Sequence, residues 1–279
     1  MALRWANQAG AGGQNPLLSA WTLMRGFPSW LKSRGLRRVR VIIGDKAAGM
    51  VSSIADVFPK VKYHPVSWTR STYPLDFSLD DYALILHGIL AKENVSRPVL
   101  VGQSLGGYVA QAYADLFPGE VAGFVSIDSA PLKRSYYPKW EIAAPRHTKG
   151  MYLSIPWRLL RRWGSFGTAA TPHGRAQMRA MMERYGRREY CELATHGYLM
   201  LSDAIDACRP YAIDCPALLL CGEYDRAGDV RPFNKKWNEV EGIPLVWVPR
   251  AGHNSNVDDS EFVNNQIDQF LHSIDEENV

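Results

Sequence analysis

The chain has few cysteines, no long apolar run and little net charge. None of the cysteines forms a C-x-x-C pair, which argues against a disulfide scaffold or a zinc knuckle and is typical of reduced thiols; they are Cys191, Cys208, Cys215 and Cys221. No apolar run approaches the roughly 18 residues that a transmembrane helix needs. The net charge of +4 over 279 residues predicts no nucleic-acid partner. Residues 1–13 also lack a secretory signal pattern, so we expect a cytoplasmic protein.

From about residue 38, short apolar runs alternate with helix-like segments. The predicted strands cover residues 39–43, 61–68, 98–101, 121–127, 217–221 and 244–248. The predicted helices cover residues 47–58, 79–94, 106–117 and 261–274. Continuous apolar strands separated by helices are typical of a parallel sheet that is covered on both faces. The sequence therefore predicts an α/β fold with a mostly parallel sheet.

The alternation stops between residues 129 and 214, where no strand is predicted and residues 157–163 and 175–185 have amphipathic helical patterns. We therefore predict a core of residues 1–131 and 215–279 with an inserted helical cap of residues 132–214. Between Leu132 and Tyr190 there are 13 lysines and arginines against 3 glutamates, a net charge of +10. This charge indicates either a solvated helix face or attraction of an anionic substrate, an acidic partner or a membrane surface.

A glycine-rich segment, V-G-Q-S-L-G-G, lies between a predicted buried strand and a predicted helix. Its G-x-S-x-G core indicates a nucleophile when it lies between a strand and a helix, because the sharp turn there raises the serine hydroxyl above the sheet. Strand and helix approach closely at such a turn, so we expect Gly102 and Gly106, helped by Gly107, to be required for their small size. The helix N-terminus then offers N–H groups to a developing oxyanion. The pattern predicts Ser104 as a nucleophile.

A serine nucleophile needs a base and an acid. His253 lies in the segment A-G-H-N, in a loop after the last predicted strand. His87 precedes a glycine but falls inside a predicted helix, so we do not expect it to serve an oxyanion site. Asp225 ends the segment C-G-E-Y-D after another strand, and Asp128 is the alternative acid. The chain order serine, acid, histidine is the order expected for a nucleophile on this type of turn.

These three segments resemble the nucleophile elbow, the acid loop and the histidine loop of the α/β-hydrolase fold superfamily. Within it, residues 75–279 are similar to the capped hydrolases that cleave esters, lactones and peptides. The resemblance implies Ser104 as nucleophile, His253 as base and Asp225 as its partner. It implies the backbone N–H of Leu105 as one oxyanion donor, and it implies no metal and no organic cofactor.

The sequence departs from the family upstream of these segments. Members usually carry a strand that ends in His-Gly, and the following residue gives the second oxyanion N–H; here V-I-I-G-D-K stands at that place. One hypothesis is a divergent N-terminal third, with Gly44 or Asp45 near the oxyanion site. The other is that the first seventy or so residues are altered, for instance by a reading-frame error.

The leading expectation is therefore a cofactor-independent serine hydrolase that forms an acyl-enzyme intermediate. Its substrate would be a small ester, lactone or thioester, with an amide as a further candidate and with an acyl part that is apolar and optionally anionic. The missing His-Gly leaves open a protein that binds a ligand with little or no catalysis. Lyase or transferase chemistry with the same residues stays open as well.

Overall fold

The computed structural model describes residues 41–44, 62–65 and 77–277. The chain divides into two units, residues 1–72 with 92–95 and residues 73–91 with 96–279. In the first unit, β1 (Val41–Gly44) pairs in parallel with β2 (Lys62–Pro65). These strands lie within the predicted segments 39–43 and 61–68 to within one residue. The helix predicted over 47–58 lies outside the described residues.

The second unit contains a sheet of four parallel strands in the order β3-β4-β5-β6. They are β3 (Val99–Gln103), β4 (Gly123–Ile127), β5 (Ala217–Gly222) and β6 (Leu245–Val248). The prediction of parallel pairing is confirmed for this sheet. Because parallel strands run the same way, the loops after β3, β4, β5 and β6 all leave from one edge. The serine, acid and histidine segments follow β3, β5 and β6 at that edge.

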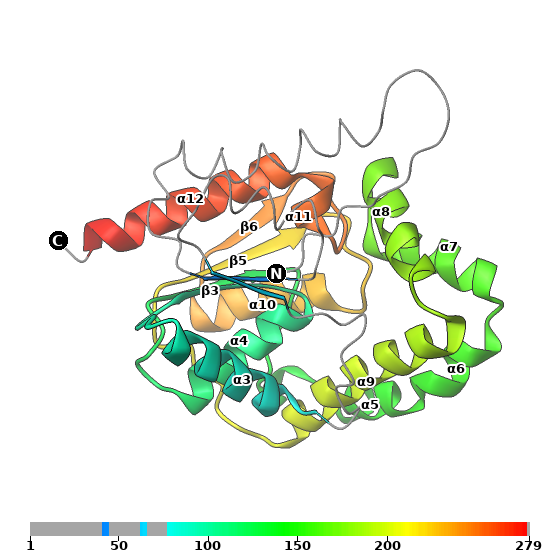
Figure 1. Ribbon diagram of the computed structural model, residues 1–279, viewed down its shortest axis with the longest axis horizontal. Coiled ribbons are helices and arrows are strands. Elements are labelled where there is room, and N and C mark those ends of the chain that lie inside the picture. The colour runs from blue at the N-terminus through cyan, green and yellow to red at the C-terminus, as the bar shows by residue number, and fades with distance from the viewer. Residues whose placement is uncertain (1–40, 45–61, 66–76, 278–279) are drawn as a thin grey trace. The chain divides into compact units, whose positions relative to one another are not determined.

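Helices cover both faces of this sheet, and β4 is buried along its whole length as a result (Figure 1). Val125 and Ile127 face one side, where they join a core with residues of α12 (Ser260–Glu277). Phe124 faces the other side, where its ring lies 6.1 Å from that of Trp237 in α10 (Val230–Glu241). Burial of each such side chain contributes about 1.5–3 kcal/mol to folding.

Two further helices, α3 (Leu79–Lys92) and α4 (Leu105–Leu116), flank the first strand of this sheet in sequence. Ser78 caps α3: the backbone N–H of Asp81 donates to its hydroxyl oxygen, and the Ser78 hydroxyl and N–H donate to the Asp81 carboxylate. α4 packs on β3, and its N-terminus comes directly after the serine turn. Among the described residues, none of the helices is both long and apolar enough to cross a membrane.

Residues 134–206 form a helical insertion between β4 and β5, and no strand occurs in this fully described segment. Its elements are η1 (Arg134–Tyr136), α5 (Lys139–Ala143), η2 (Ala144–His147), α6 (Thr148–Ser154), α7 (Trp157–Thr168), α8 (Pro172–Glu183) and α9 (Arg187–Asp206). The predicted amphipathic stretch 157–163 falls in α7, and the stretch 175–185 overlaps α8 but extends two residues beyond its end. Leu160, Met182 and Cys191 form a small core of the insertion. The insertion also exposes several large apolar side chains, Trp140 and Trp163 among them.

Candidate active site

Ser104 is the single residue between the last residue of β3 and the first residue of α4. Its backbone has φ 50° and ψ −117°, a strained conformation for a residue with a side chain. Two backbone hydrogen bonds hold this conformation. The N–H of Ser104 donates to the carbonyl of Ile127 at 2.8 Å, and its carbonyl accepts from Gly107 at 2.9 Å. These bonds join the strained turn to the end of β4 and to the first turn of α4.

The glycines of the turn have unequal roles. A Cβ at Gly102 would lie 2.3 Å from the backbone of Gly106, and a Cβ at Gly107 would lie 2.6 Å from Cβ of Ser129. By contrast, a Cβ at Gly106 would meet no described atom within 4 Å. The expectation that Gly106 must be small is therefore wrong, because its missing side chain would point away from the strand. Gly102 must be small because the backbone of Gly106 and Gly107 approaches it, and Gly107 must be small because of Ser129.

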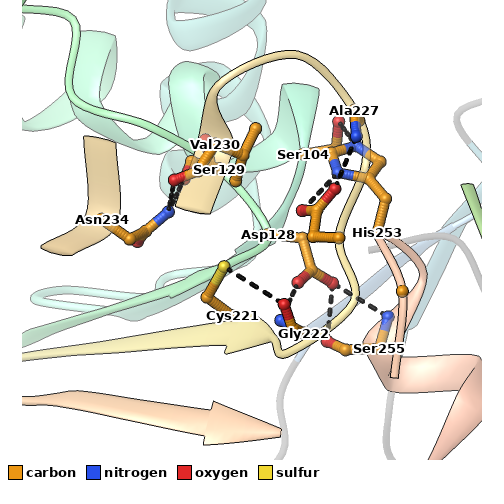
Figure 2. A network of polar contacts seen from close by, with 12 residues as sticks. Ser104, Asp128, Ser129, Cys221, Gly222, Ala227, Val230, Asn234, His253 and Ser255 are labelled. Atoms are coloured by element: carbon orange, nitrogen blue, oxygen red, sulfur yellow. Dashed lines mark hydrogen bonds and ion pairs between the residues drawn. The ribbon is translucent and has the colours of Figure 1, made fainter. Parts of the chain in front are cut away.

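The side chains of Ser104, His253 and Asp225 form a continuous hydrogen-bonded chain. Figure 2 labels two of its members, Ser104 and His253. Nε2 of His253 lies 2.8 Å from Oγ of Ser104, and Nδ1 lies 2.9 Å from Oδ2 of Asp225. The Asp225 side chain is fully buried and that of His253 is 12% exposed. One ring nitrogen is thus placed to accept a proton from the serine while the other donates to the acid.

The loops that carry Asp225 and His253 are fixed to each other and to the serine turn. The backbone N–H of Ala227 donates to Oδ1 of Asp225 at 2.8 Å, so both carboxylate oxygens have a partner. Nε2 of Gln103 donates to the carbonyl of His253 at 2.9 Å. A Cβ at Gly222 would lie 2.2 Å from a carbonyl oxygen of the histidine loop, so only glycine fits there.

The surroundings of His253 shift the pKa of its imidazole in opposing directions. Burial lowers this pKa, because it disfavours the charged ring. The hydrogen bond from the ring to Asp225 and the charges of Asp225 and Asp128 outweigh burial, so the pKa lies above its usual 6.5. The site therefore stabilises the imidazolium that would form when His253 takes a proton.

Asp128, the alternative acid, lies beneath these residues and binds the backbone instead (Figure 2). Its carboxylate accepts from the N–H of Gly222 at 2.8 Å, from the N–H of Ser255 at 2.9 Å and from the Ser255 hydroxyl at 2.6 Å. Burial raises the pKa of Asp128 to about 7, although the charge of His253 and the hydrogen bond from Ser255 lower it. Asp128 thus joins the end of β5 to the histidine loop, and the structure brings Asp225 to His253.

Asp128, Asp225 and Cys221 form a buried group whose polar atoms lie within 4.8 Å of one another. Such a group could be considered as a metal site. Both carboxylates, however, already accept hydrogen bonds on both oxygens, and burial raises the pKa of the Cys221 thiol well above its usual range. A thiol held in its protonated form would have to lose its proton before it could bind a metal ion. These residues fit a hydrogen-bonded support for the site better than a set of metal ligands.

Two residues near the site were not predicted from the sequence. Gln103 orients the His253 backbone, as described above. Asp258, in α11 (Ser255–Asp258), accepts from the N–H of Gly252 at 2.8 Å and from that of Ala170 at 2.7 Å, among four hydrogen bonds. It thereby joins the histidine loop to the loop between α7 and α8. An aspartate at the end of a four-residue helix carries no sequence signal for such a long-range contact.

The comparisons with known proteins agree with this geometry. Residues 19–266 match the alpha/beta hydrolase family. The chain belongs to that family. Its fold and its parallel sheet with flanking helices are those of an α/β hydrolase, and a hydrolase is the general class of activity that this membership supports. A search of curated protein sequences finds no significant match to the chain.

Solved structures of this hydrolase fold superpose on much of the chain at low sequence identity. A thermophilic esterase from Thermogutta terrifontis has 20% identity and a TM-score of 0.56, over 71% of this chain and 73% of its own. A carboxylesterase from the thaumarchaeon Nitrososphaera gargenis has 14% identity and a TM-score of 0.53, over 73% and 75%. E-2-(acetamidomethylene)succinate hydrolase has 17% identity and a TM-score of 0.53, over 84% and 91%. These similarities concern the fold.

The candidate oxyanion donors are only partly described. Leu105 is the first residue of α4, so its N–H has no carbonyl partner one turn earlier in the helix and can bind an anion next to Ser104. Gly44 is the last residue of β1, which belongs to the other unit of the chain. Asp45 lies outside the described residues. The assignment of the second donor to Gly44 or Asp45 stays a prediction.

Proposed function

We propose that this α/β hydrolase is a serine hydrolase that cleaves a small ester, lactone or thioester through an acyl-enzyme intermediate. The observation that carries the proposal is the hydrogen-bonded chain from Ser104 through His253 to Asp225, with distances of 2.8 and 2.9 Å. Each side chain has the functional group that its role needs: a hydroxyl that attacks, an imidazole that accepts a proton, and a buried carboxylate that orients the imidazole.

In the first half of the reaction, Oγ of Ser104 attacks the carbonyl carbon of the substrate while Nε2 of His253 takes the hydroxyl proton. Asp225 holds the proton of the ring on Nδ1 and stabilises the imidazolium. The carbonyl oxygen becomes an oxyanion, which the N–H of Leu105 and the N-terminus of α4 stabilise. The tetrahedral species then collapses, and His253 gives its proton to the leaving alcohol or thiol.

In the second half, a water molecule attacks the acyl group on Ser104. His253 now takes a proton from that water, and the same oxyanion donors act again. The acid product leaves as the proton returns to Ser104. The proposed reaction needs no cofactor, because the nucleophile, the base and the donor are all groups of this chain.

The structural relatives support an ester as the bond that is cleaved, since two of the three named above are described as esterases. The third is named for a substrate that contains an acetamido group, which keeps an amide as a further candidate. We propose that residues 132–214 act as a cap that limits access of water to the acyl-enzyme. The position of the α7–α8 loop against the histidine loop supports this role.

Binding of a ligand without turnover is the second candidate function. The observation that favours it is the absence of the usual His-Gly, because a missing oxyanion donor typically lowers kcat by about 100- to 1,000-fold. Such a protein would retain the pocket chemistry of the family and hold its ligand near Ser104. Turnover, rather than binding, separates the two candidates.

The test is hydrolysis of a panel of p-nitrophenyl esters by the wild type and by Ser104→Ala. We expect turnover by the wild type and only background release of p-nitrophenol with the variant. Turnover that is equal in the two proteins would contradict the assignment of Ser104. No turnover in either, together with saturable binding of one ester, would favour the second candidate.

A further inference from the structure

Two arginines from separate elements lie against the ring of Phe166, in the last turns of α7. The guanidinium carbon of Arg175, in α8, is 4.6 Å from the ring centroid, and that of Arg226 is 4.5 Å from it. Phe166 is 50% exposed in this arrangement. Phe166 is thus an aromatic surface that carries two cations and still contacts solvent.

This cluster adjoins both loops that hold the proposed catalytic residues. Arg226 directly follows Asp225 in the chain, and the next residue donates its N–H to the Asp225 carboxylate. On the other side, Nε of Arg175 donates to the carbonyl of Ala169 at 3.0 Å. A Cβ on Gly252, the neighbour of His253, would lie within 3.0 Å of the backbone of Ala169, so the two loops are in direct contact.

The positive charge of the cluster is not neutralised within the described part of the chain. Neither Arg175 nor Arg226 forms an ion pair with a described acid. Two acids of the adjoining segments are already engaged: Asp225 binds His253 and Ala227, and Asp258 accepts four hydrogen bonds from backbone and hydroxyl groups. Two guanidinium groups without a described acidic partner therefore lie at one exposed aromatic ring, where a substrate anion could accept charge-assisted hydrogen bonds.

We propose that Arg175 and Arg226 bind a carboxylate at the far end of the substrate's acyl chain, with Phe166 contacting the apolar part of that chain. A guanidinium presents its N–H groups in a planar fork that matches a carboxylate, and the two forks come from different loops. The substrate class is then an ester of a dicarboxylic acid with one free carboxylate. The inference rests on the proposed function, because it places this carboxylate beside a serine hydrolase site.

The experiment compares two esters that differ in one end group, mono-p-nitrophenyl adipate and p-nitrophenyl hexanoate. We expect the wild type to have the higher kcat/KM for the adipate ester. Arg226→Gln and Arg175→Gln should each lower kcat/KM for the adipate ester about tenfold, since a hydrogen bond to a charged group is lost. Their kcat/KM for the hexanoate ester should stay within about twofold of the wild type.

Arg188→Gln is the matched control, because the Arg188 side chain is 85% exposed on α9 and distant in sequence from both loops. This variant should leave kcat/KM for both esters unchanged. The preference for adipate should also fall as salt is added. If Arg226→Gln lowered kcat/KM equally for both esters, Arg226 would have a structural role. If the ratio of the two kcat/KM values were the same as in the wild type, there would be no carboxylate site. Either result overturns the inference.

A binding measurement keeps this test separate from that of the proposed function. The affinity of Ser104→Ala for the two esters is measured by calorimetry, with and without Arg226→Gln. Tighter binding of the adipate ester that is lost with Arg226→Gln would support the carboxylate site even if the wild type turned over neither ester. Equal affinities for both esters would overturn the carboxylate site while leaving the proposed hydrolysis intact.

Discussion

Replacement of Asp225 by asparagine tests the role of the acid in a way that the structure makes quantitative. The N–H of Ala227 donates to Oδ1 of Asp225, so the amide oxygen of an asparagine should take that position. Its NH₂ group would then face Nδ1 of His253, which in the wild type lies 2.9 Å from Oδ2. If Nδ1 of His253 accepts a hydrogen bond from this NH₂ group, the neutral ring must carry its proton on Nε2. Nε2 could then no longer take the proton of Ser104.

The size of the effect follows from the two orientations of the amide. An imidazole held in the wrong tautomer costs about 10⁴-fold in kcat, or about 5.5 kcal/mol. Turning the amide to restore the correct tautomer would leave its NH₂ against the N–H of Ala227. An unsatisfied buried donor costs about 1–3 kcal/mol, so the active orientation of the amide would be populated in only a small fraction of the molecules. The loss of kcat is then at least roughly tenfold. We therefore expect Asp225→Asn to lower kcat between about tenfold and 10⁴-fold.

The assay is steady-state hydrolysis of a p-nitrophenyl ester, with thermal denaturation to show that the variant is folded. Asp128→Asn is the matched control, since Asp128 is also buried but binds Gly222 and Ser255. Its free energy of unfolding, measured by urea denaturation, should fall by about 1–3 kcal/mol, because an amide cannot accept all three hydrogen bonds of Asp128. The kcat of the folded variant should stay within about tenfold of the wild type. A kcat for Asp225→Asn within threefold of the wild type, or a larger loss in Asp128→Asn, would refute the reasoning.

Two further predictions concern the base and the turn. Because His253 must be neutral to accept a proton and its pKa lies above 6.5, kcat/KM should rise with pH through an ionisation above that value; a profile that is flat or falling between about pH 5 and 9 would contradict this. Gly102→Ala should be destabilised by about 1–3 kcal/mol or more in urea denaturation, because its Cβ would lie 2.3 Å from backbone atoms, whereas Gly106→Ala should fold with equal or greater stability. Equal destabilisation of both variants would argue against the described turn.

The sequence predicted those parts of the fold that depend on local pattern. The strands could be predicted because both faces of the sheet are covered, so that consecutive residues such as Phe124 and Val125 are all apolar. The segments that carry Ser104, Asp225 and His253 were readable because glycines and polar residues follow directly after such strands. The structure brings these three side chains into hydrogen-bonding distance, and their catalytic roles stay a prediction.

The parts that could not be predicted depend on contacts between distant segments. Gly106 and Gly107 look alike in the sequence, and only the position of Ser129, two residues after the end of β4, determines which of them must lack a side chain. Asp258 resembles any surface acid until the α7–α8 loop is placed against the histidine loop. The pairing of Arg175 with Arg226 across Phe166 joins residues about fifty positions apart, and no periodic pattern records it.

The central claim is that Ser104 is a nucleophile activated by His253. Labelling of the protein with a fluorophosphonate, followed by mass spectrometry of its peptides, tests that claim most directly, because the probe reacts only where a base and an oxyanion donor activate the hydroxyl. We predict a single adduct on Ser104 that is lost in both Ser104→Ala and His253→Ala. No adduct on Ser104 in the folded wild type, or equal labelling of the His253→Ala variant, would contradict it.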